Sequence, residues 1–151
     1  MPSIFVAADV EALEARIDSL KPDSPRLWGS MDAARMLAHV NVSYEMLYEP
    51  GKHKKPNGLV MFLLKVFVKQ SVVGDKPYKH NGQTAPAFVI ADARDFEAEK
   101  ARTKAYLRRV LAEGEAAFEG RESLSFGKLT AREWNNLFHK HLDHHLAQFG
   151  V

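Results

Sequence analysis

Hydrophobic residues recur at helical spacing in four long stretches of this chain. Each stretch places apolar side chains three or four positions apart, the period of an amphipathic α-helix; the stretches are residues 8–20, 30–48, 92–119 and 130–150. A shorter apolar segment at residues 58–72 predicts one further helix, and the turn-rich residues 74–86 predict a long loop. Strand-like alternation is confined to a short piece at residues 88–91. The pattern therefore predicts an all-α fold, a four-helix bundle with a long crossover loop and a short extra helix, in one domain over residues 1–151.

Capping residues suggest where the long helices begin and end. Ser30 is a candidate N-cap for the second helix. The third helix can begin at Asp92 or Asp95 and is expected to run to about residue 119, with Gly120 as its C-terminal cap. Residues 130–133 (TARE) form a capping box, which predicts the start of the fourth helix.

The composition is that of an ordinary soluble domain, with 46% hydrophobic and 26% charged residues. A net charge of +2 is too small to argue for binding to nucleic acid. The chain contains no cysteine, so any metal must be held by His, Asp or Glu. The first residues lack the charged start and long apolar core of a signal peptide, and we therefore expect a cytoplasmic location.

The apolar segment at residues 58–72 has three interpretations. Its apolar run before Lys65 is seven residues long, far short of the roughly 20 that a membrane span needs. With Lys65 and Lys69 it has the pattern of an amphipathic helix that lies on a membrane surface. More often such a segment covers the core or forms a homodimer. We expect one of these two roles ahead of attachment to a membrane surface.

Histidines gather near the end of the chain, where residues 139–145 hold four of the seven. On a helical wheel, His141 and His145 lie four apart on the same face as Trp134, Phe138 and Gln148. His144 lies at the edge of this apolar face. The opposite face, expected to be exposed to solvent, carries Asn136, His139, Lys140 and Asp143. A further histidine, His39, lies within the apolar stripe of the second helix.

Two neighbouring neutral imidazoles in an apolar core are hard to satisfy, because each needs both a donor and an acceptor. One interpretation is a set of hydrogen-bonded core histidines. The other is a divalent metal ion held by His39, His141 and His145, with coordination positions left open for water or substrate. A set of ligands made only of histidines suits zinc, nickel, iron or cobalt and does not choose among them.

Several segments, spread over nearly the whole chain, carry a resemblance to a known family. They are residues 28–31 (WGSM), 36–39 (MLAH), 76–77 (KP), 126–130 (FGKLT), 133–134 (EW) and 141–150 (HLDHHLAQFG). A histidine in the second helix with HxxHH in the last helix resembles the DinB-like superfamily of four-helix-bundle metalloenzymes. The resemblance is closest to a branch with the terminal HLDHHLAQFG motif. It implies the same ligands, His39, His141 and His145.

Some members of this superfamily transfer low-molecular-weight thiols such as bacillithiol or mycothiol. The resemblance therefore implies a metal-dependent thiol S-transferase that acts on a small-molecule substrate. A non-catalytic metal-binding or dimeric stress-response module remains open. So does a metal-assisted hydrolase, although its nearest candidate bases by helical phase, Glu45 and Glu133, are not well placed.

Three residues on or beside the inward-facing sides of the second and fourth helices are candidates to line a pocket: Ser43, His144 and Gln148. The loop at residues 74–86 is expected to form a lid or rim. His53 and His80 lie in polar loops and are interpreted as solvated, although His80 could border the pocket.

Overall fold

The computed structural model describes residues 2–151, and most of these lie in helices. The helices are α1 (Ala7–Ser19), α2 (Ala33–Tyr48), α3 (Gly58–Leu63), α4 (Lys69–Val73), α5 (Phe96–Glu113), α6 (Ala131–Asn135) and α7 (His141–Gln148). The strands β1 (Arg121–Ser123) and β2 (Gly127–Leu129) pair antiparallel in a small hairpin. The prediction of a mainly helical protein is confirmed.

Two π-helical turns join short helices into longer ones. Leu64–Val68 connects α3 to α4, and Asn136–Lys140 connects α6 to α7. Residues 58–73 and 131–148 are therefore two continuous helices, each with one widened turn. A π turn adds a residue to the repeat and so changes which side chains share a face beyond it.

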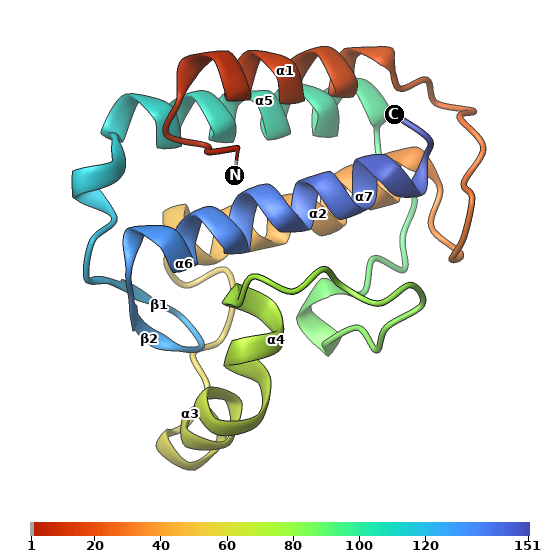
Figure 1. Cartoon of the computed structure of the whole chain (residues 1–151). Coiled ribbons are helices and arrows are strands. Elements are labelled where there is room, and N and C mark those ends of the chain that lie inside the picture. The colour runs from red at the N-terminus through yellow and green to blue at the C-terminus, as the bar shows by residue number, and fades with distance from the viewer. Residues whose placement is uncertain (1) are drawn as a thin grey trace.

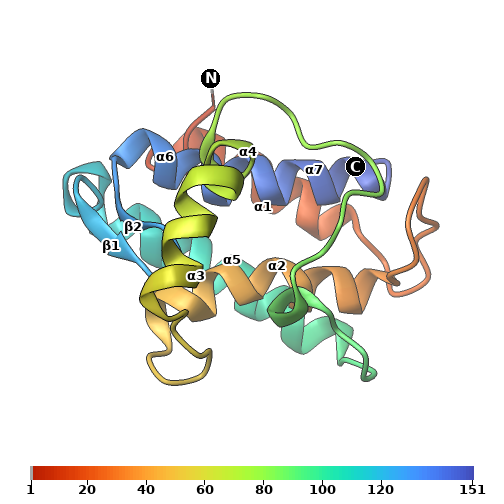
Figure 2. The ribbon, with the colours of Figure 1, turned by 90° about the horizontal axis from the view of Figure 1, so that it is seen from below.

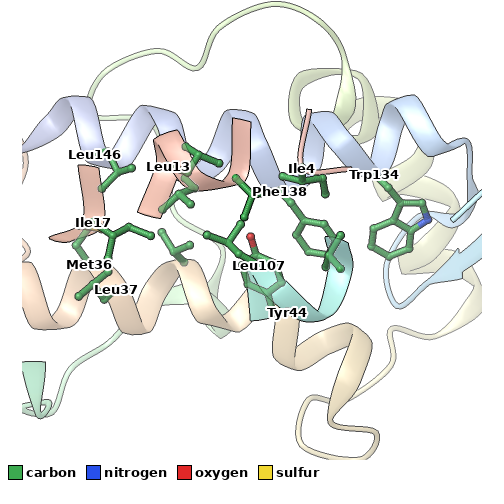
Figure 3. Close-up of a cluster of buried hydrophobic side chains, with 14 of the residues drawn as sticks. Ile4, Leu13, Ile17, Met36, Leu37, Tyr44, Leu107, Trp134, Phe138 and Leu146 are labelled. Atoms are coloured by element: carbon green, nitrogen blue, oxygen red, sulfur yellow. The ribbon is translucent and has the colours of Figure 1, made fainter. Parts of the chain in front are cut away.

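Four long helical segments enclose the core (Figure 1). The helix α2 packs against α5 and α7, and α1 packs against the same two helices. Their facing side chains fill one apolar cluster, part of which is drawn in Figure 3. Among its fully buried members are Ile4, Leu13, Ile17, Met36, Leu37, Tyr44, Leu107, Trp134, Phe138 and Leu146. Trp134 is a core residue, as expected, with 2% of its surface exposed.

The helix formed by α3 and α4 lies outside the four long helices (Figures 1 and 2). Of its residues only Val73 is fully buried and apolar. The expectation that this segment covers the core is therefore wrong for most of its length. Within residues 2–151, no helix is both long enough and apolar enough to cross a membrane.

Two expected helix boundaries differ in the structure. The N-cap of α2 is Asp32 rather than Ser30, because the Asp32 carboxylate accepts a hydrogen bond from the backbone N–H of Arg35. The helix α5 begins after Asp95 but ends at Glu113, six residues before its expected end. Gly114 takes a positive φ of 77°, which breaks the helix, and the chain continues into a short 3-10 turn at Glu115–Ala117.

The expected strand at residues 88–91 is absent from the described residues. Phe88 instead closes a 3-10 turn over Pro86–Phe88. The hairpin of β1 and β2 was not predicted, because three-residue strands are too short to show an alternating pattern.

A buried ionic network fastens α2 to α5. Glu45 is 5% exposed and accepts hydrogen bonds from Arg102, from Lys52 at 2.9 Å and from His53 at 2.8 Å. Burial alone would raise the pKa of Glu45, but the hydrogen bonds from Arg102, Lys52 and His53 outweigh it and lower the pKa to about 2. His53 is thus a partner of a buried carboxylate and not a solvated loop residue. The expectation for His53 was wrong.

We predict that Glu45→Gln lowers the free energy of unfolding by about 3 kcal/mol at neutral pH, because it leaves partly buried cations without their counter-charge. The folded-state pKa of Glu45 lies below its ordinary value of 4.5, so its stabilisation is present above pH 4.5 and is lost as the pH falls through about 2. Urea denaturation across this pH range should show that the free energy of unfolding falls less on acidification in the variant than in the unaltered chain.

The matched control is Glu49→Gln, since Glu49 also contacts Lys52 and Arg102 but its side chain is 38% exposed. This change should cost less than about 1 kcal/mol. If the two variants lose the same amount of unfolding free energy, the burial of Glu45 does not account for its contribution.

Candidate metal centre

Three imidazole rings meet between α2 and α7. His39 comes from the middle of α2, and His141 and His145 come from successive turns of α7. The three residues are 6%, 9% and 8% exposed. One nitrogen from each ring lies within 4.8 Å of the others, and the Nε2 atoms of His39 and His141 are 3.0 Å apart. Tetrahedral ligands with metal–nitrogen distances of about 2.0–2.1 Å lie roughly 3.4 Å from one another, so small side-chain movements would bring these nitrogens to that spacing.

A π turn precedes His141 and His145 on the same helix, and the buried face is only partly the one that a helical wheel predicts. Trp134, Phe138 and Gln148 are buried on the helix, as the wheel predicts. Asn136, expected on the solvent face, is 3% exposed and donates to the carbonyl oxygen of Val73 at 2.9 Å. The wheel assumed a regular α-helix, and it also could not show that α4 covers this side of the helix.

The tautomer of His39 is fixed by a backbone carbonyl. The Nδ1 atom of His39 lies 2.8 Å from the carbonyl oxygen of Phe88. A carbonyl oxygen only accepts hydrogen bonds, so Nδ1 must carry the proton. The Nε2 atom of a neutral His39 therefore has a free lone pair, and this lone pair faces His141.

A chain of two hydrogen bonds fixes His145 in the same way. The side-chain nitrogen of Gln148 donates to the carbonyl oxygen of Trp28 at 2.8 Å. This contact decides the orientation of the amide and turns its oxygen toward Nδ1 of His145, at 2.9 Å. Nδ1 of His145 is therefore also a donor, and its Nε2 atom is left without a proton. Such outer hydrogen bonds are the usual means of orienting histidines that bind metals.

Burial keeps all three rings neutral near pH 7. It lowers the pKa of His39, lowers that of His145 to about 3, and lowers that of His141 well below its ordinary value of 6.5. The neighbouring histidines lower the pKa values of His141 and His145 further. Neutral imidazole is the form that binds a metal ion, so no ring has to be deprotonated first; His141 only has to carry its proton on Nδ1 instead of Nε2.

Aromatic side chains from three loops surround the histidines. The rings of Trp28 and His80 are stacked with centroids 3.7 Å apart, and His144 lies 5.6 Å from Trp28. Tyr78 and Phe88 present their rings edge-on to His141 at 6.1 Å and 5.9 Å. The loop at residues 74–86 thus contributes Tyr78 and His80 to the rim of the site. His80 is exposed, but it is not simply solvated.

The three candidate pocket residues have different positions. Gln148 contacts His145 directly, and the His144 ring lies 5.0 Å from that of His145. The Ser43 hydroxyl donates to the carbonyl oxygen of Val40 at 2.8 Å.

Sequence reasoning missed the roles of Trp28 and Phe88, because a backbone carbonyl leaves no signal in the sequence. Trp28 lies in the WGSM segment that carries the family resemblance, but Phe88 stands beside Val89 and Ile90 and was not distinguished from them.

Carboxylates are not part of this centre. Among residues 2–151, the group of His, Asp and Glu side chains close enough to share an ion consists of the three histidines alone. Glu45 belongs to the network with Arg102, and Glu133 closes the capping box of α6 and pairs with Lys69.

No match was found when the chain was compared with protein-family models, with curated proteins and with solved structures.

Gly29 provides a specific test of the outer hydrogen bonds. Its φ is +80°, and a Cβ at this position would lie 2.4 Å from the side-chain nitrogen of Gln148. We predict that Gly29→Ala displaces Gln148, releases His145 from its orientation and weakens metal affinity by roughly 10–100-fold. Titration with zinc against a competing chelator measures the change.

Gly51→Ala is the matched control. Gly51 has a similar φ of +86°, but its added Cβ would meet no atom within 4 Å. It therefore imposes similar backbone strain without touching the site. If both variants bind zinc as the unaltered chain does, Gln148 has no part in orienting the ligands.

Proposed function

We propose that this chain binds one divalent metal ion through His39, His141 and His145. The observation that carries the proposal is the direction of the ring nitrogens. Oxygen acceptors hold Nδ1 of His39 and of His145, so that each of these rings keeps an unprotonated Nε2, and the three rings each have a nitrogen within 4.8 Å of the others. Without a metal ion, the single N–H of His141 can donate a hydrogen bond to only one of these nitrogens at a time. A metal ion satisfies them together.

We further propose that the helical fold and this centre are of DinB-like type, and that the activity is transfer of a low-molecular-weight thiol. Three protein ligands leave a coordination position for an exogenous group. A bound divalent ion lowers the pKa of a thiol, which supplies a nucleophile to a chain that has no cysteine. The thiol sulfur would form a bond to an electrophilic carbon while the carbon–halogen bond breaks. The halide would leave, and the thiol proton would pass to solvent.

Two alternatives have different support. A non-catalytic metal-binding module is supported by the low exposure of the three ligands, at most 9%. A hydrolase would need a nearby general base to activate water. Glu45 and Glu133 are both engaged in ion pairs elsewhere, so the hydrolase has the least support.

Elemental analysis of protein purified without a tag tests the metal centre. We predict about one divalent ion per chain, and near-complete loss of it in His39→Ala. His139→Ala is the control, since His139 precedes the site on the same helix but lies outside the three-histidine group. Chelation should lower the melting temperature, because a ligand that binds only the folded state stabilises it.

The helical signal in circular dichroism should survive chelation, because the apolar core does not include the metal. Complete unfolding would show that the ion is structural. A chain that carries no metal and melts unchanged with a chelator would instead contain three hydrogen-bonded histidines.

A thiol-consumption assay separates the enzyme from the binding module. The metal-loaded protein is incubated with glutathione, bacillithiol or mycothiol and a chlorinated or epoxide acceptor. We predict thiol loss for the unaltered chain and none above background for His145→Ala, with helix content unchanged. Metal-loaded protein that is inactive with every thiol would favour the non-catalytic module.

A further inference from the structure

The helix of residues 58–73 carries an exposed apolar stripe that the core does not explain. The stripe consists of Leu59, Phe62, Leu63, Val66 and Phe67, which are 70%, 60%, 43%, 54% and 75% exposed. These five side chains, together with Val60 at 42% exposed, leave most of the apolar surface of this helix uncovered. Figures 1 and 2 show that α3, which begins the stripe, lies at the outer end of this helix, away from the core. An exposed apolar surface of this kind marks a binding site.

The charge around this helix is strongly one-sided. Residues 51–80 contain seven lysines and a single acid, Asp75, which gives a net charge of +6. The rest of the chain therefore carries a net charge of −4, although the total of +2 appears unremarkable. Positive charge is concentrated on the segment that also exposes the apolar stripe.

Most of this positive charge is available to a partner. Within residues 2–151, four of the seven lysines form no ion pair: Lys54, Lys65, Lys76 and Lys79. All four are exposed. They lie before the stripe, beside it and beyond its end. The remaining three, Lys52, Lys55 and Lys69, pair with acids of neighbouring elements.

We propose that residues 51–80 bind the surface of an anionic lipid bilayer. The 16-residue helix is about 24 Å long, too short to cross a hydrocarbon core of about 30 Å. It lies in the plane of the membrane, with Phe62 and Phe67 of the stripe inserted among the lipid chains. The unpaired lysines contact anionic headgroups. An apolar side flanked by lysines is the arrangement of helices that bind at this interface.

Charge complementarity favours a lipid surface over a second copy of the chain. A two-fold symmetric contact through the stripe would place the same patch against itself. The four unpaired lysines of one copy would then face those of the other, and this repulsion opposes association. An anionic bilayer neutralises the same charges.

Vesicle co-sedimentation tests the proposal. We expect the full chain to sediment with vesicles of phosphatidylcholine containing about 30% phosphatidylglycerol, and to be released when NaCl rises from about 0.05 M to 0.5 M. It should not sediment with phosphatidylcholine alone. Phe62→Ser with Phe67→Ser should lower the partition coefficient at least about tenfold. Changing the four unpaired lysines to glutamate should lower it by more than about a hundredfold.

Two matched variants control for general effects. Val89→Ser removes an apolar side chain that is 59% exposed but lies outside this helix, and Lys21→Glu reverses an exposed charge elsewhere. Both should bind vesicles as the unaltered chain does. Binding of equal strength to neutral vesicles, or no binding at all, would overturn the proposal. So would a dimer in sedimentation velocity that the phenylalanine variant abolishes while no vesicle is bound.

Discussion

Three neutral imidazole rings share one buried position between α2 and α7, and much of the surrounding structure satisfies their polar requirements. A buried ring nitrogen without a partner costs about 1–3 kcal/mol, more than a typical hydrogen bond contributes. Phe88 and Gln148 each supply an oxygen to one ring, and each comes from a different part of the chain. The site therefore fixes the positions of elements that the apolar core does not reach.

The contacts between the histidine centre and the rest of the chain are clearest in two loops. The segment that leads into α2 is held where the Trp28 carbonyl accepts from Gln148, and Gly29 allows the close approach because it has no side chain. The loop before α5 is held where Phe88 contacts His39 through both its carbonyl and its ring. Neither segment contributes a fully buried apolar side chain at these positions. Arg35 also holds the second segment through the carbonyl oxygens of Ala91 and Asp92, but the contacts to Gln148 and His39 are the ones that join both segments to the site. A change at the histidines is therefore expected to reach the rim of aromatic rings.

The sequence predicted those parts of the fold that depend on repeating patterns. Helical periodicity located the four long helices, and the spacing of His141 and His145 indicated that both rings share a buried face. It could not show that His39 would lie 3.0 Å from His141, because that distance depends on how α2 and α7 pack. The π turn before His141 and the packing of α4 against it leave no sequence signal, and Asn136, expected on the solvent face, is buried. The end of α5 at Gly114 was missed because the apolar spacing continues to Phe118, which is buried although it lies beyond the helix.

The Glu45 network and the histidine centre differ in charge, and the difference bears on the chemistry of the histidine centre. Glu45 is surrounded by Arg102, Lys52 and His53, so its negative charge is already neutralised. The histidine centre has no carboxylate among its members, and burial keeps its rings neutral. A divalent ion held there would keep its full charge of two in a poorly solvated position, where electrostatic interactions are strong. Such an ion favours an anion at its open position, because no carboxylate is among its ligands. Hydroxide formed from bound water is one such anion, and a three-histidine site can form it without a carboxylate. The thiolate of the proposed reaction is another. The absence of acidic side chains therefore leaves the open position to an anion from outside the protein, which the proposed thiol would supply as thiolate.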